Sequence, residues 1–268
     1  MIAAIIAAAG SGERFGADIP KALIQLGNRT LLEHAVASLA PVAEKIVVTA
    51  PAGYEKRMQE LVGDGITVVT GGATRSDSVR AGLAAIDGAD FVLVHDAARA
   101  LATSDLAKKV VQALVGGEVA VVPALPVVDT LQTVASSGYV DAAVDRAPLR
   151  RIQTPQGFSY AVLKEIHKQV ADASDDSTLV LAAGHRVKTI TGEERALKIT
   201  TPSDLATALT FLGAAHNFRT GVGVDAHTFA EGNELWLAGL HWPNEIGDRK
   251  STRLNSSHTD ISRMPSSA

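Results

Sequence analysis

The sequence has no cysteine, no excess of basic residues and no membrane-spanning segment at its apolar start. Without cysteine there can be no disulfide bond, thiol nucleophile or cysteine-ligated zinc. Its 25 basic residues are outnumbered by 29 acidic ones, which argues against a protein that binds nucleic acid. The apolar start is too short to cross a bilayer and lacks the basic segment that opens a signal peptide. We therefore expect a cytoplasmic protein without a membrane partner.

Hydrophobic residues make up 46% of the chain and recur in short runs. These runs are continuous rather than alternating, which is typical of strands buried on both faces of a parallel sheet. Helical segments separate them, so we predict a doubly wound α/β domain that binds ligands at the carboxyl ends of its strands. The predicted strands are Ile2–Ala7, Lys45–Thr49, Ile66–Thr70, Phe91–His95 and Val119–Pro123. The predicted helices begin at Thr30 and cover about Tyr54–Val62, Arg75–Ile86 and Ser104–Val115.

A different pattern interrupts the core between Val127 and Arg151. Two runs of strand-forming residues flank a Ser-Ser-Gly turn there, so we predict a β-hairpin arm inserted into the α/β core. Beyond the arm we predict helices from about Ser159 and at Asp176–Ala183, strands at Arg186–Ile190 and Ala196–Ile199, and a last helix from Thr201 to about Ala214.

The first predicted strand runs into a glycine-rich loop, Ala8–Arg14, which is followed by Pro20 and Lys21. Glycine lets a backbone approach phosphate oxygens closely, and Arg14 and Lys21 can neutralise a phosphoryl group under attack. The loop is not a Walker A motif, and its glycine spacing fits the dinucleotide fingerprint poorly, although Glu33 lies where a dehydrogenase would have its ribose-binding acid. The alternatives are a nucleotide loop, a dehydrogenase and a glycine turn without a ligand.

Polar residues also follow two other predicted strands. Gly71–Arg75 opens a helix and combines backbone donors with a cation, and Ser78 adds a hydroxyl. Asp96 ends the fourth strand, where its carboxylate can hold Mg²⁺ directly or through water; the alternative is a helix cap. Lys198, on an otherwise apolar strand, must extend to solvent or meet an anion. Because carboxyl ends of parallel strands share one edge, we expect the three strand-end motifs to gather there.

In order along the chain, these motifs resemble one family, 2-C-methyl-D-erythritol 4-phosphate cytidylyltransferase of the non-mevalonate isoprenoid pathway. The resemblance covers about Ile2 to Leu212. The matching elements are Ala8-Ala9-Gly10-x-Gly12-x-Arg14, Pro20-Lys21, Gly71-Gly72-x-x-Arg75-x-x-Ser78-Val79, His95-Asp96-Ala97-Ala98-Arg99, Asp129-Thr130, Asp145-Arg146, Thr154-Pro155-Gln156 and Ile190 to Lys198. One departure is Ala100, where the family usually has proline, and we expect only a small effect on the loop.

The resemblance implies a nucleotidyltransferase that moves CMP from CTP to 2-C-methyl-D-erythritol 4-phosphate and releases pyrophosphate, with Mg²⁺ as cofactor. The implied nucleotide-binding residues are Ala8, Ala9, Gly10, Gly12, Gly72, Arg75, Ser78 and Asp96. The implied catalytic residues are Arg14, Lys21, Arg146 and Lys198, and the implied substrate contacts are Thr130, Arg146 and Asp96. The resemblance also implies a homodimer in which the arm reaches the other subunit.

Two other functions fit the same fold. One is a transferase acting on another sugar or polyol phosphate, against which the pair Thr130 and Arg146 argues. The other is a nucleotide-binding remnant without turnover, against which the intact Arg14, Lys21 and Lys198 argue.

The sequence predicts a boundary after this domain, residues 1–214, with a linker at 215–219. Asp225 and His227, two apart on a predicted strand, project to one face; both types ligate zinc, but zinc needs at least one more protein ligand. Residues 220–247 resemble the start of 2-C-methyl-D-erythritol 2,4-cyclodiphosphate synthase, the lyase of the same pathway. We interpret them as the truncated stub of a second α/β domain whose zinc or other divalent-metal site is incomplete. The serine-rich tail, 248–268, resembles neither family, so we predict disorder there and loss of the lyase activity.

Overall fold

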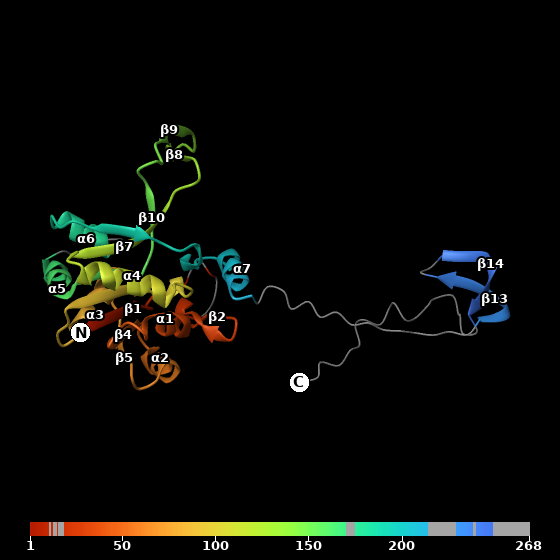
Figure 1. Ribbon diagram of the computed structural model, residues 1–268, viewed down its shortest axis with the longest axis horizontal. Helices are drawn as coiled ribbons and strands as arrows, with labels where there is room; N and C mark the ends of the chain where they lie inside the picture. The colour runs from red at the N-terminus through yellow and green to blue at the C-terminus, as the bar shows by residue number, and fades with distance from the viewer. Residues whose placement is uncertain are drawn as a thin grey trace. The chain divides into compact units, whose positions relative to one another are not determined.

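The computed structural model describes residues 1–10, 12, 15, 19–169, 175–213, 229–237 and 240–248 (Figure 1). The chain divides into two units, Met1–His216 and Asn217–Ala268. The predicted domain boundaries stay a prediction. Among the described residues, no helix has the length and apolar character needed to cross a bilayer.

An eight-stranded sheet forms the centre of the first unit, in the order β10-β7-β11-β6-β1-β4-β5, with β12 also paired to β7. The strands are β1 (Ile2–Ala7), β4 (Lys45–Ala50), β5 (Thr67–Thr70), β6 (Phe91–Asp96), β7 (Ala120–Pro126), β10 (Arg150–Ile152), β11 (Gln156–Ser159) and β12 (Lys188–Thr191). β5, β4, β1 and β6 are mutually parallel, as are β12 and β7, whereas β10 and β11 run antiparallel to their neighbours. The predicted doubly wound, mostly parallel sheet is confirmed.

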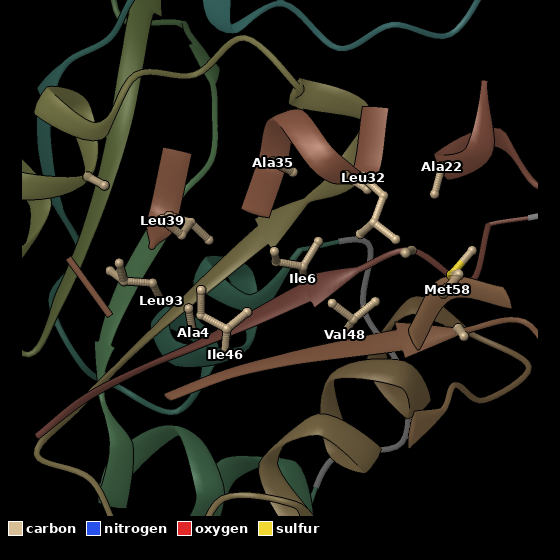
Figure 2. Packing of buried hydrophobic residues seen from close by; sticks show 14 of the residues in the cluster. Ala4, Ile6, Ala22, Leu32, Ala35, Leu39, Ile46, Val48, Met58 and Leu93 are labelled. Carbon is tan, nitrogen blue, oxygen red and sulfur yellow. The ribbon is translucent and has the colours of Figure 1, made fainter. Parts of the chain in front are cut away.

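Helices cover both faces of this sheet because side chains alternate along its buried strands. Ala4 and Ile6 of β1 join the cluster packed under α1, α2 and α4 (Figure 2), whereas Ala3 and Ile5 join the cluster packed under α3, α5 and α6. The helices are α1 (Leu31–Leu39), α2 (Glu55–Val62), α3 (Arg75–Ala84), α4 (Ser104–Val115), α5 (Tyr160–Gln169), α6 (Asp176–Ala182) and α7 (Pro202–Phe211).

Threonine side chains start several of these helices. Thr30, Thr74 and Thr201 each accept a hydrogen bond from the backbone N–H three residues on. The carboxylate at that position accepts a hydrogen bond from the backbone N–H of the threonine, which completes a capping box. The predicted starts at Thr30 and Thr201 are therefore confirmed. A small ribbon, β2 (Gln25–Leu26) with β3 (Arg29–Thr30), precedes α1.

One predicted strand is wrong. Ala196–Ile199 does not join the sheet: a 3-10 turn, Glu194–Ala196, leads into an irregular segment that carries Lys198. An isolated hydrogen bond holds this segment in place of a strand ladder: the N–H of Ile199 donates to the Ala98 carbonyl oxygen over 2.8 Å. Its apolar pattern reflects burial of Ala196 and Ile199 rather than strand pairing.

The arm consists of β8 (Leu131–Val134) and β9 (Val140–Val144), paired antiparallel. It stands away from the body of the first unit (Figure 1), and every residue of β9 is exposed. The hairpin predicted from the sequence is therefore present.

The second unit contains one described hairpin, β13 (Phe229–Leu237) paired antiparallel with β14 (Leu240–Asp248), with register shifts along β13. Asp225 and His227 lie outside the described residues, as does most of the predicted tail. The incomplete metal site and the disorder of the tail stay predictions.

Candidate active site

A cavity of about 580 Å³ opens where β1, β5 and β6 end. These strands are parallel, so their carboxyl ends bring together segments far apart in the sequence. The volume lies within the ~300–1,000 Å³ typical of small-molecule sites. The residues predicted from sequence that line this cavity are Ala8, Ala9, Gly10, Gly12, Lys21, Gly72, Arg75, Ser78, Asp96 and Lys198.

The loop after β1 combines open space with a placed cation. Outside its chain neighbours, a Cβ added to Gly10 would meet no atom of the described residues within 4 Å, so this part of the chain leaves room for a ligand at that position. Gly12 has a φ of +74°, and a Cβ there would lie 3.1 Å from the Cβ of Lys21, which shows that the loop packs directly on this lysine. Lys21 opens a 3-10 turn after Pro20. Arg14 lies outside the described residues.

The loop after β5 is packed too tightly for larger residues. A Cβ added to Gly71 would lie 2.6 Å from the Cβ of Ala9, and one added to Gly72 would lie 2.1 Å from the Cβ of Asp77. The Ser78 hydroxyl holds this loop, because it accepts from the Gly72 N–H at 3.2 Å and donates to the Thr74 carbonyl oxygen at 3.0 Å. The two glycines therefore bring the start of α3 against the first loop.

Charged side chains converge on Asp96 at the end of β6. Its Oδ1 accepts from Nε of Arg75 at 3.2 Å, and its Oδ2 lies 2.8 Å from Nζ of Lys198. The Asp96 side chain is 11% exposed and that of Lys198 is 44% exposed, so the lysine reaches from the cavity toward a nearly buried carboxylate. The N–H of Asp96 donates to the Thr154 hydroxyl over 3.1 Å, which fixes the backbone at this position.

These contacts keep the cluster charged. Burial alone would raise the pKa of the Asp96 carboxyl, but the positive charges of Arg75 and Lys198 outweigh it and hold the pKa below its ordinary value. Burial alone would lower the pKa of the Arg75 guanidinium, but Asp176 and Asp96 outweigh it and raise the pKa. At neutral pH the site therefore holds an ionised carboxylate between two cations.

Two neighbours of Asp96 have structural roles. Burial lowers the pKa of His95 to about 4, so this imidazole is neutral, and its Nδ1 lies 2.8 Å from the Thr154 hydroxyl. Arg99 donates to the carbonyl oxygens of Ala196 and Ile152 at 2.8 and 3.0 Å. Arg99 thereby ties the segment before Lys198 to β10.

The structure does not bring Thr130 and Arg146 to this cavity. Both are exposed: Thr130 directly precedes β8, and Arg146 follows β9. Neither is among the residues that line the cavity. The guanidinium of Arg146 donates to the Val128 carbonyl oxygen, which closes the base of the arm.

Sequence reasoning missed Asp176. It is fully buried, and its Oδ2 accepts from Nη1 of Arg75 at 2.5 Å. In the sequence it reads only as an acid in the first turn of a helix, and no local signal shows its long-range contact.

Comparisons with known proteins agree with this geometry. Residues 2–214 match the family model of IspD, 2-C-methyl-D-erythritol 4-phosphate cytidylyltransferase. A protein of that name from Rhodococcus jostii is 46% identical over 211 residues, which are 77% of this chain and 93% of the relative. The crystal structure of the cytidylyltransferase from Thermus thermophilus superposes with a TM-score of 0.68 at 38% identity, covering 79% of this chain and 98% of that one.

A longer relative matches further along the chain. The bifunctional enzyme IspD/IspF of Clavibacter michiganensis is 43% identical over 261 residues, covering 91% of this chain, so the similarity extends into the second unit. This chain spans 64% of that relative's length. From the match over residues 2–214 and these relatives, the chain belongs to the IspD family.

Proposed function

We propose that this chain transfers CMP from CTP to 2-C-methyl-D-erythritol 4-phosphate and releases pyrophosphate. The observation that carries the proposal is the convergence of an open glycine backbone with Lys21, Arg75 and Lys198 on one cavity at the carboxyl edge of the sheet. This combination suits a triphosphate, because backbone donors and cations both stabilise phosphate oxygens. Family membership supplies the identity of the two substrates.

The proposed reaction is an exchange of phosphate bonds. An oxygen of the substrate's 4-phosphate bonds to the α-phosphorus of CTP, and the bond from that phosphorus to the bridging oxygen breaks, so pyrophosphate leaves with the electron pair. A phosphate monoester has its second pKa at about 6 and is already largely ionised at neutral pH, so no general base is required. The work of the protein is alignment and charge neutralisation, which we assign to Lys21, Lys198 and Arg14. Arg75, Ser78, Gly72 and the first loop are proposed to hold the nucleotide.

The residues of the cavity fit a magnesium ion that arrives with the nucleotide. Among the described residues that line it, Lys21, Arg75 and Lys198 are cations and Asp96 is a carboxylate. Their net charge of +2 is smaller in magnitude than the negative charge of a triphosphate. Each oxygen of Asp96 already contacts a cation, so we propose that Asp96 holds Mg²⁺ through water and that the phosphates supply its direct ligands. When bound, the ion would neutralise phosphate charge.

We propose that a homodimer completes the site. Thr130 and Arg146 are the expected contacts of the methylerythritol phosphate, yet they lie on the exposed arm outside the cavity lining. The arm also exposes Val134, Tyr139 and Val140, apolar side chains that a second subunit would cover. We propose that each arm carries these contacts to the other subunit. The cytoplasmic location stays a prediction.

We propose that the second unit is the first part of a cyclodiphosphate synthase domain. The support is the bifunctional relative, whose match covers 91% of this chain. Asp225 and His227 remain the proposed ligands of zinc or another divalent metal in a domain of this kind.

The test is to incubate the purified chain with CTP, Mg²⁺ and 2-C-methyl-D-erythritol 4-phosphate and to follow pyrophosphate. Release that requires both substrates supports the proposal. No release by a chain that still binds CTP would favour a transferase for another sugar or polyol phosphate, which a panel of such phosphates would identify.

A further inference from the structure

A buried acid behind the cavity has both carboxylate oxygens engaged. Asp176, the first residue of α6, is 0% exposed; its Oδ1 lies 2.9 Å from Nε2 of His167, and its Oδ2 lies 2.5 Å from Nη1 of Arg75. His167, on α5, is also buried. Asp176 is not among the residues that line the cavity, whereas Arg75 is. Among the described residues, the hydrogen bond to Arg75 therefore connects Asp176 to the cavity lining.

Arg75 is held at two different nitrogens by two different carboxylates. Its Nε donates to Asp96 and its Nη1 donates to Asp176. A planar guanidinium fixed at two nitrogens has one orientation, whereas one fixed at a single nitrogen can turn about that contact. Lys198 also pairs with Asp96, so Arg75 and Lys198 share this carboxylate and the orientation of Arg75 affects both ion pairs.

Buried side chains anchor the helix that begins with Asp176. Leu179 and Val180, one turn along α6, are buried in the cluster under the sheet, so the start of this helix has a fixed position. The His167 carbonyl oxygen accepts from Nε of Arg80 at 2.9 Å, which ties α5 to α3, the helix that Arg75 opens. The row Lys198, Asp96, Arg75, Asp176, His167 thus runs from the cavity into the interior of the protein.

We infer that Asp176, supported by His167, is a positioning residue that orients the Arg75 guanidinium for binding of the nucleotide. The inference rests on the proposed function in one respect, namely that CTP is the nucleotide. It concerns CTP affinity, so it can be tested without turnover.

The experiment measures CTP binding calorimetrically in the full chain, beside the free energy of unfolding in urea. Asp176→Asn should weaken CTP binding about tenfold, the effect of losing one charge-assisted contact. In an Arg75→Ala background the same change should have no further effect on CTP affinity, because Asp176 acts only through Arg75. Leu114→Ala, on α4, is the control, because Leu114 is buried in the cluster on the other face of the sheet: it should reduce stability and leave CTP affinity unchanged.

A second pair of variants keeps the inference testable when Asp176→Asn does not fold. His167→Leu removes the donor to Asp176 and should weaken CTP binding, whereas His167→Gln keeps an N–H donor and should restore it. Any of four results overturns the inference. Two concern Asp176→Asn, namely normal CTP binding and an effect that persists unchanged without Arg75. The other two are equally weakened binding in Leu114→Ala and wild-type binding in both His167 variants. A wild-type chain that binds CTP without releasing pyrophosphate would contradict the proposed reaction alone, and one that binds no CTP would overturn both.

Discussion

Gly10 and Gly72 line the same cavity, and each can be replaced by alanine in a separate variant. Comparing the two variants should distinguish a glycine that leaves room for a ligand from one that the packing of the protein requires. A Cβ at Gly72 would lie 2.1 Å from the Cβ of Asp77 and 3.1 Å from its carbonyl carbon, so the backbone would have to move. Outside its chain neighbours, a Cβ at Gly10 would meet none of the described residues within 4 Å. The change at Gly72 therefore collides with the protein, whereas the change at Gly10 collides with no residue that the structure describes.

The two variants should shift stability in opposite directions. Gly72→Ala should lower the free energy of unfolding by about 1–3 kcal/mol, the usual cost of overpacking. Gly10→Ala should raise it by about 0.4–1 kcal/mol, because alanine restricts the unfolded chain, and the φ of Gly10 lies outside the left-handed region. Binding should show a separate effect: the new methyl group at Gly10 occupies space proposed for a phosphate and should weaken CTP binding about tenfold, or ~1.4 kcal/mol.

Urea unfolding followed by circular dichroism gives the stabilities, and titration calorimetry with CTP gives the affinities. A Gly10→Ala chain that binds CTP as tightly as the wild type would refute the proposal that phosphates approach this loop. A Gly72→Ala chain as stable as the wild type would refute the close approach between the second loop and α3.

Three further predictions concern charge and assembly. Lys21→Ala should lower kcat for pyrophosphate release about 100- to 1,000-fold with little change in the free energy of unfolding. Lys108→Ala, on the exposed surface of α4, is the control and should change neither kcat nor stability. Near-normal turnover in Lys21→Ala would contradict the role proposed for Lys21. The folded pKa of Asp96 lies below its ordinary value of 3.8, so its contribution to stability is present above that pH and is lost as the pH falls through the folded pKa. Asp96→Asn should therefore flatten the loss of stability in acid, and an unchanged acid limb would contradict the ion-pair geometry. Val140→Asp on the arm should convert the proposed dimer to a monomer in sedimentation velocity. A wild-type chain that is already monomeric would contradict the proposed dimer.

Sequence patterns identified those elements whose signals are local. β1 reads as a strand because it is apolar throughout, and it is buried on both faces; Thr30 and Thr201 start helices because their capping boxes span only four residues. The strand Gln156–Ser159 was not predicted, because it is short and begins with a polar side chain, although that residue is buried between β6 and β7. Ala196–Ile199 was wrongly predicted as a strand for a related reason: an apolar run indicates burial, but it does not show that the backbone pairs with a neighbouring strand.

The candidate site shows the same division. The loops carrying Lys21 and Asp96 were placed at one edge of the sheet because the parallel topology requires it, and both residues line the cavity. Asp176 was missed because its role depends on two contacts, with Arg75 and His167, that only the folded chain brings about. The spacing of residues along the chain does not predict such contacts.

The glycines of the site are alike in the sequence and different in their physical roles. Gly10 leaves space open, Gly12 adopts a φ of +74° and packs on Lys21, and Gly72 allows a close approach to Asp77. Only the first of these roles is proposed to involve the ligand directly. The second places a cation, and the third places the helix that begins with Arg75, so both act through the side chains they position. A glycine-rich motif can therefore remain necessary for folding even where no phosphate touches it, and affinity for CTP has to be measured together with stability before a glycine is assigned to the nucleotide.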